Sequence, residues 1–364
     1  MRVLDRMLMR VLDRMLLPVT LLMPPATVVA QSGVVPSESL SPLRCAPGGN
    51  ALRAEGFVIL GGVEQWVTVS GADCHNPVIL FLHGGPGNTL SPYSSSIYGG
   101  WEEDFTIVQW DQRGAGRTYG RNPGLSGADL TVAQMVQDGI ELAAYLAGHL
   151  DKRKIVLVGT SWGSVLGVHL ASARPDLFHA YVGVSQLVSY RENQAASYRK
   201  LLAAARAAGD GATVSVLEGL GPPPWTNPRN FGIMRRAIRA YEAKSSVASP
   251  GSWWVPAPPY TTPAVSAEYE AGEEYSYLQF VGLAGDGMFS RIDLRELGHE
   301  FEVPFFLVHG AGDLLTVPEV ARRYFESIVA PEKAFVLLDR TGHDPNAAVR
   351  DTVYGILKQR AAEW

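Results

Sequence analysis

The sequence has no long run of basic residues. Its 364 residues include 31 Lys and Arg against 36 Asp and Glu, which gives a formal net charge of −5. It therefore lacks the electrostatic footprint of a nucleic-acid-binding protein, and no sustained apolar run indicates a multi-span membrane protein. Hydrophobic residues make up 46% and charged residues 18%, so a sizeable core can form. The length indicates about two domains, or one large domain with an insertion.

Cysteine is scarce, and the common metal and phosphate motifs are missing. The two cysteines, Cys45 and Cys74, form no C-x-x-C pattern, and no H-E-x-x-H occurs among the dispersed histidines. No G-K-[ST] follows the glycine-rich turns, so a phosphate-binding loop is not supported. We expect no metal and no organic cofactor. A disulfide between Cys45 and Cys74 and two unrelated thiols are both compatible with the sequence.

The N-terminal segment is typical of a secretory signal. The octamer MRVLDRML occurs twice in residues 1–16, which makes Met9 an alternative start, and an uncharged apolar run with a small-residue pattern follows. We predict a signal peptide over residues 1–30 and a Ser-, Pro- and Gly-rich linker over residues 31–50, and expect a secreted or periplasmic protein. The alternative is an uncleaved N-terminal anchor.

Residues 51–190 and 301–364 alternate buried strands with helices. This pattern predicts an α/β fold, in which helices cover both faces of a mostly parallel sheet. Such sheets bind ligands at the carboxyl ends of their strands, where the glycine-rich turns of this chain fall. Residues 191–300 interrupt the alternation with helical, proline-rich and aromatic segments. We predict that this insertion is a mainly helical cap over the active face, the alternative being a helical layer with long loops.

Residues 159–163, Gly-Thr-Ser-Trp-Gly, have the G-x-S-x-G form between a predicted strand and a predicted helix. A serine on this sharp turn has a strained backbone, and flanking side chains would crowd it, so both glycines are needed. The helix N-terminus behind the serine supplies N–H groups for negative charge. Ser161 is therefore the candidate nucleophile.

A serine nucleophile needs a base, and the base needs an acid to orient it. Asp313 follows the strand FFLVHG and His343 follows the strand FVLLD, in the chain order serine, acid, histidine. Asp339 and Asp344 are weaker candidates because neither leaves a strand end in this way. His309 lies within the strand before Asp313, and we expect it to be structural.

The turn HGGPG at residues 83–87 is the third candidate element of the site. A turn dense in glycine brings backbone N–H groups close to a developing oxyanion. We assign the two oxyanion donors to the N–H groups of Gly85 and Trp162.

Five motifs of this chain resemble those of the proline iminopeptidase group of α/β-hydrolases. They are HGGPG (83–87), WDQRGAGRT (110–118), GTSWGS (159–164), GAGD (310–313) and TGH (341–343). The resemblance extends from about residue 61 to the C-terminus and is weakest over 191–300. It implies the α/β-hydrolase fold, with Ser161 as nucleophile, Asp313 as acid and His343 as base. It also implies that Asp111 and Arg113 form a buried charged turn that supports the site.

The residues by which the family binds its substrate are not fully matched in this chain. Family members that remove N-terminal proline hold the substrate amine with cap glutamates, often in a Trp-Glu motif, which the cap here lacks. Thr160 also stands where the family usually has glycine. An acidic patch could replace the missing motif, with Glu270 and Glu274 as candidate anchors, or it could be a solvated helix face. The patch consists of Glu268, Glu270, Glu273 and Glu274.

These observations predict an exported serine hydrolase that removes N-terminal residues from small peptides through an acyl-enzyme. An alternative is a carboxylesterase or lactonase for a bulky neutral ester, since aromatic residues of the cap suit an apolar substrate or simply pack the cap. Those aromatic residues are Trp225, Trp253, Trp254 and Tyr260, of which Trp253 and Trp254 are our candidates for substrate contact. A second alternative is a non-catalytic binding protein of the same fold.

Overall fold

The computed structural model describes residues 40, 43, 49–125, 127 and 130–364. The predicted signal peptide, most of the predicted linker and Cys45 lie outside the described residues. No helix in the described ranges is both long enough and apolar enough to cross a membrane.

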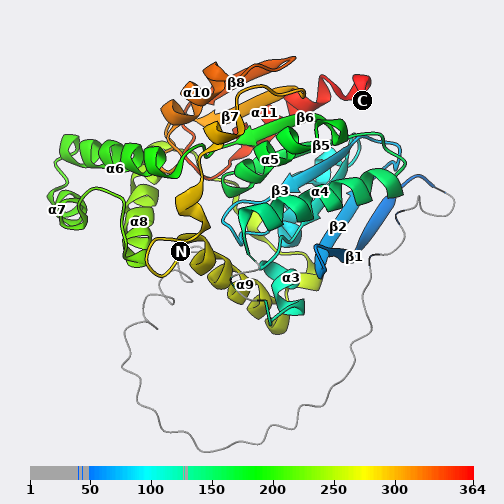
Figure 1. Cartoon of the computed structure of the whole chain (residues 1–364), viewed down its shortest axis with the longest axis horizontal. Coiled ribbons are helices and arrows are strands. Elements are labelled where there is room, and N and C mark those ends of the chain that lie inside the picture. The colour runs from blue at the N-terminus through cyan, green and yellow to red at the C-terminus, as the bar shows by residue number, and fades with distance from the viewer. Residues whose placement is uncertain (1–39, 41–42, 44–48, 126, 128–129) are drawn as a thin grey trace, which may run out of the picture.

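Eight strands form one sheet in the order β1-β2-β4-β3-β5-β6-β7-β8 (Figure 1). The strands are β1 (Leu52–Leu60), β2 (Val63–Gly71), β3 (Val78–Leu82), β4 (Thr106–Trp110), β5 (Ile155–Thr160), β6 (Phe178–Val184), β7 (Phe305–Gly310) and β8 (Lys333–Leu338). The β1–β2 hairpin is antiparallel, and β2 also pairs antiparallel with β4. All other pairs are parallel, which confirms the predicted mostly parallel sheet.

Helices cover both faces of the sheet. The α-helices of the described ranges, including those of the insertion, are α2 (Ser94–Tyr98), α3 (Gly116–Arg121), α4 (Val132–His149), α5 (Trp162–Ala173), α6 (Tyr190–Ala207), α7 (Gly211–Leu220), α8 (Pro228–Ser245), α9 (Pro263–Val281), α10 (Pro318–Ser327) and α11 (Ala347–Lys358). Thr131 is the N-cap of α4, as its sequence predicts, because its side chain accepts a hydrogen bond from the N–H of Gln134.

Alternate residues of the central strands enter two separate cores. Leu80 and Leu82 of β3 pack with α4 and α5 on one face, whereas Ile79 and Phe81 pack with α11 on the other. Because both faces of β3 are buried, its five residues form a continuous apolar run. Leu40 and Leu43 are also buried in the first core, so these two residues of the predicted linker pack against the domain.

The 120 residues between β6 and β7 contain no strand. They form α6, α7, α8 and α9 with short 3₁₀ turns. Figure 1 shows α6, α7 and α8 projecting beyond one end of the sheet, while α9 runs beside α3. A third apolar cluster holds the projecting helices together, with Leu201, Leu217 and Ile238 among its buried members.

Candidate active site

Ser161 lies at the sharp turn between β5 and α5. Its backbone angles, φ 53° and ψ −116°, fall in a region that a residue with a side chain rarely adopts. The flanking glycines explain how the turn is accommodated. A Cβ on Gly159 would lie 2.5 Å from the oxygen of Gly163, and a Cβ on Gly163 would lie 1.9 Å from the oxygen of Leu82. The packing of α5 against β3 therefore requires glycine at both positions.

The structure brings the three residues of the predicted triad together. His343 Nε2 lies 3.0 Å from Ser161 Oγ, and His343 Nδ1 lies 3.0 Å from Asp313 Oδ2. Both distances are within hydrogen-bond range. Ser161 is half-buried, whereas Asp313 is fully buried. The arrangement allows His343 to accept the proton of the serine hydroxyl while the carboxylate orients its ring.

Asp313 is held as an ionised acceptor. Its Oδ1 accepts the N–H groups of Leu315 and Thr316, each at 2.8 Å. Burial alone would raise the pKa of Asp313, but the charge of His343 and hydrogen bonds from His309 and His343 outweigh burial and hold this pKa well below its ordinary value. His309 lies 3.3 Å from Asp313 Oδ2 and also bonds to the oxygen of Thr316. It therefore contacts the acid and not the serine.

Gly85 and Trp162 line the same cavity as Ser161. No hydrogen bond within the described ranges engages the N–H group of either residue. Gln112 holds the two segments in place, since its Oε1 accepts from Trp162 Nε1 at 3.0 Å and its Nε2 donates to the oxygen of His83. Burial lowers the pKa of His83 to about 4, so this imidazole is neutral at physiological pH.

The turn after β4 carries buried charges on both sides of Gln112. Arg113 donates to both oxygens of Asp138, at 2.7 and 2.9 Å. Asp111 accepts the N–H of Arg117 at 3.0 Å and the hydroxyl of Tyr269 at 2.7 Å. Neither Asp111 nor Arg113 lines the cavity at Ser161. Their contacts join β1, α3, α4 and α9 around the site, as expected for a structural role.

Helices α6, α8 and α9 close a cavity of about 200 Å³ over Ser161. Its walls are mainly apolar and aromatic, with Phe231, Phe280 and Phe289 among them. Of the substrate-binding residues predicted from the sequence, Glu274 lines this cavity, whereas Glu270, Trp253 and Trp254 do not. Trp253 is buried beside Arg350, and Trp254 packs edge-on against Tyr93.

Sequence reasoning did not single out Glu273 as a site residue, although it belongs to the predicted acidic patch. It lines the cavity, and its Oε1 accepts a 2.6 Å hydrogen bond from Asn88, which directly follows the HGGPG turn. A Cβ on Gly87 would lie 2.9 Å from the Cα of Glu273, so α9 packs directly on this turn. Burial raises the pKa of Glu273. This carboxylate forms no ion pair within the described part of the chain.

Sequence reasoning also missed Glu242 of α8. Its two carboxylate oxygens accept the N–H of Leu314, at 2.7 Å, and the N–H of His343, at 3.1 Å. One buried side chain therefore connects the loop that carries Asp313 to the loop that carries His343. Burial, then the negative charge of Asp313, raises the pKa of Glu242 to about 7. The contacts span 72 and 101 residues of sequence, and no local pattern marks them.

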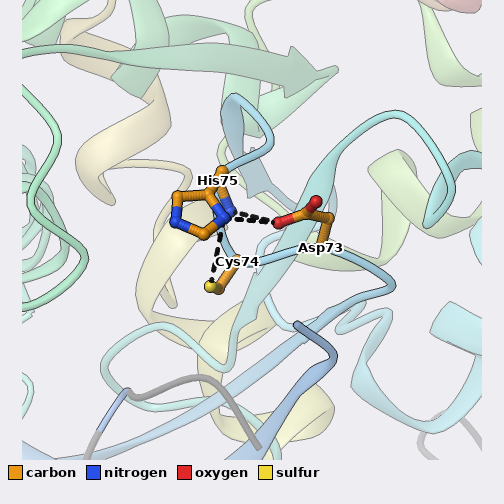
Figure 2. Close-up of side chains that lie close together, drawn as sticks. All are labelled: Asp73, Cys74 and His75. Atoms are coloured by element: carbon orange, nitrogen blue, oxygen red, sulfur yellow. Dashed lines mark hydrogen bonds and ion pairs between the residues drawn. The ribbon is translucent and has the colours of Figure 1, made fainter. Parts of the chain in front are cut away.

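One group within the described ranges has the composition of a metal site. It consists of Asp73, Cys74 and His75, on the turn after β2 (Figure 2). The sulfur of Cys74 is disulfide-bonded, so it offers no thiolate, and His75 Nδ1 is hydrogen-bonded to Asp73 Oδ1 at 2.8 Å. Because the Cys74 sulfur and His75 Nδ1 are committed to other bonds, we assign no metal to this turn.

Comparisons with known proteins agree with this geometry. Residues 77–347 match the family described as the alpha/beta hydrolase fold. A probable aminopeptidase of Bacillus subtilis, YbaC, is 29% identical over 300 residues, covering 79% of this chain and 89% of that protein. A probable proline iminopeptidase of Streptomyces coelicolor is 25% identical over 297 residues, covering 74% and 83%. The solved proline iminopeptidase of Mycobacterium smegmatis superimposes with a TM-score of 0.59 at 21% identity, over 85% of this chain and 99% of that one.

Proposed function

Because the chain belongs to the alpha/beta hydrolase fold family, we propose that it is a serine hydrolase with aminopeptidase activity, similar to proline iminopeptidases. The observation that carries the proposal is the hydrogen-bonded series of Ser161, His343 and Asp313, whose serine lines a cavity that Glu273 also lines. The similarity to proteins named aminopeptidase and proline iminopeptidase supports it.

In the proposed reaction, Ser161 Oγ attacks the carbonyl carbon of the scissile bond and passes its proton to His343 Nε2. The N–H groups of Gly85 and Trp162 bind the oxyanion. The C–N bond then breaks as His343 returns the proton to the leaving amine, which leaves an acyl-enzyme. A water molecule, deprotonated by His343, hydrolyses the ester to Ser161 and regenerates the hydroxyl.

The free amine of the substrate is the group that Glu273 fits. The backbone of Glu273 packs against the HGGPG turn, and its carboxylate accepts a hydrogen bond from Asn88, directly after that turn. Glu274 lines the same cavity. An ammonium group placed here would form an ion pair with Glu273, which has none within the described part of the chain. In this proposal Glu273 and Glu274 bind the amine, and Glu270 has no part because it does not line the cavity.

The test compares proline p-nitroanilide with its N-acetylated form and with p-nitrophenyl acetate. We expect hydrolysis of the free-amine anilide, none of the blocked one, and loss of all activity in Ser161→Ala. Glu273→Gln should lower the ratio of anilide to acetate kcat/KM by about 10- to 100-fold, the value of a charge-assisted hydrogen bond. Glu270→Gln, on the same helix, is the matched control and should keep the wild-type ratio.

The apolar walls of the cavity favour a second candidate, an esterase for an apolar acyl group. Hydrolysis of p-nitrophenyl butyrate with neither anilide cleaved would reject the peptidase and support the esterase. If Ser161→Ala left all rates unchanged, both enzymatic proposals would fail and a non-catalytic binding role would remain.

We also propose that the protein is exported. This proposal rests only on the sequence of residues 1–30, with its apolar run and small-residue pattern. Expression of the full chain followed by N-terminal sequencing of the protein from each cell fraction tests it. A mature chain that starts near residue 31 outside the cytoplasm is expected, and an intact start in the cytoplasm would contradict export.

A further inference from the structure

Helix α8 places a cation in the wall of the active-site cavity. Arg235 lines the cavity together with Ser161 and Glu273. Within the described ranges its guanidinium forms no hydrogen bond and no ion pair. Burial, then the charge of Arg239, lowers the pKa of Arg235, although an arginine stays protonated at any physiological pH. A half-buried cation without a bonded anion is costly, so an anion is the ligand group that this wall accommodates best.

The neighbouring wall, formed by α6, presents acceptors that also lack a bond. Asn193 Oδ1 and Gln194 Oε1 are buried and have no hydrogen-bond partner within the described part of the chain. Both residues line the cavity, and the side chain of Asn193 is oriented by the 2.7 Å bond from its Nδ2 to the oxygen of Leu315. Asn193 is only 3% exposed, so its free acceptor fits an N–H group of a ligand inside the cavity.

The charges are arranged around the reaction centre. Arg235 interacts electrostatically with the carboxylates of Asp344, Glu242 and Asp313, and with Glu273 of α9. Three arginines line the cavity against two glutamates, the other arginines being Arg229 and Arg239. An amine bound at Glu273 would add a further positive charge. A substrate whose only charge is that amine would therefore leave the cavity more positive than before.

We propose that the substrate carries a carboxylate that pairs with Arg235, on the leaving-group side of the scissile bond, with an N–H group that donates to Asn193 or Gln194. Taken with the amine at Glu273, which rests on the proposed function, this defines a short zwitterion of dipeptide size. The cavity of about 200 Å³ also favours a small substrate, because pockets for drug-sized ligands measure roughly 300–1,000 Å³.

The experiment compares substrates that differ only in this carboxylate. The peptide pair is prolylalanine and prolylalaninamide, and the ester pair is 4-acetoxybenzoate and 4-acetoxybenzamide. For each pair the ratio of acid to amide kcat/KM is measured in wild type and in Arg235→Gln. Arg236→Gln changes an exposed arginine one position along α8 and is the matched control. Arg235→Lys keeps the charge, and melting curves of all variants check the fold.

We expect the wild type to prefer the acid by about 10- to 100-fold, the value of a charge-assisted hydrogen bond. The ratio should fall to about 1 in Arg235→Gln, stay at the wild-type value in Arg236→Gln, and be largely retained in Arg235→Lys. If no peptide is cleaved but the ester pair shows this pattern, the peptidase proposal fails and the carboxylate subsite stands. Equal rates for acid and amide in wild type, or a preference that survives in Arg235→Gln, would overturn the subsite.

Discussion

Glu242 offers a sharp test of how the cap and the catalytic loops are coupled. Its carboxylate accepts the N–H groups of Leu314 and His343, and it is only 7% exposed. We consider Glu242→Gln, which keeps the shape and removes the ionisable group. The prediction concerns how the difference in unfolding free energy between variant and wild type changes with pH.

The sign follows from the raised pKa. Burial, then Asp313, raises the pKa of Glu242 from 4.5 to about 7, so between these values the folded protein binds the proton more tightly than the unfolded chain. This contribution to stability is fully present below pH 4.5 and is lost as the pH rises through 7. A shift of this size corresponds to about 3 kcal/mol in all, and to between about 2 and 3 kcal/mol from pH 5 to pH 8.

Glutamine does not titrate, so Glu242→Gln does not lose this contribution to the unfolding free energy as the pH rises. Relative to wild type, the variant should therefore gain between about 2 and 3 kcal/mol of unfolding free energy from pH 5 to pH 8. For a chain of this length the gain corresponds to about 4 °C in melting temperature. Any pH-independent cost of replacing one carboxylate oxygen by an amide cancels in the comparison between the two pH values.

The measurement is urea unfolding of wild type, Glu242→Gln and Glu326→Gln at half-unit steps from pH 5 to 8. Glu326 is an exposed residue of α10, so its variant should follow wild type at every pH. A constant difference between Glu242→Gln and wild type across this range would refute the assigned titration of Glu242. A difference of opposite slope would show that its carboxylate stabilises the folded state more as pH rises.

Two further predictions concern the close packing of a glycine and a buried ion pair. Gly163→Ala should prevent accumulation of folded protein, because its Cβ would lie 1.9 Å from a backbone oxygen of β3. The control, Gly355→Ala on α11, meets nothing within 4 Å and should raise the melting temperature slightly. Soluble yield and melting curves measure both effects. Arg113→Ala should lower the unfolding free energy by about 3–5 kcal/mol in urea titrations, since it leaves the buried carboxylate of Asp138 without its cation. Arg174→Ala, the control, removes an exposed ion pair and should leave the unfolding free energy nearly unchanged. An equal loss of unfolding free energy in the two arginine variants would contradict this reasoning.

The three candidate catalytic residues could be located from the sequence because each follows a strand of the sheet. Ser161 follows β5, Asp313 follows β7, and His343 follows β8. The carboxyl ends of parallel strands meet at one edge of the sheet, so side chains that leave those ends converge, whatever connects the strands. The same rule places the HGGPG turn, which follows β3, beside Ser161.

The position of a residue after a strand does not identify which glutamates of the acidic patch belong to the site. Its glutamates lie on α9, and their helical spacing does not reveal which of them turns toward the cavity. That choice depends on how α9 packs: a Cβ on Gly272 would lie 2.7 Å from the backbone nitrogen of Gly116 in α3, and Ser276 bonds to the oxygen of Gly114 at 2.7 Å. With this side of α9 against α3 and the turn after β4, Glu273 and Glu274 line the cavity and Glu270 does not.

The sequence by itself determined the fold class, the order of strands and helices, and the three groups at the strand ends, because strand patterning and glycine-rich turns are local signals. Only the tertiary structure decided which cap residues meet those groups. Glu242 and Arg235 lie on one helix of the insertion, and their neighbours come from loops on β3, β7 and β8 or from α6 and α9. Such contacts depend on how helices dock across long sequence separations, where many pairings have similar local patterns and only packing selects one.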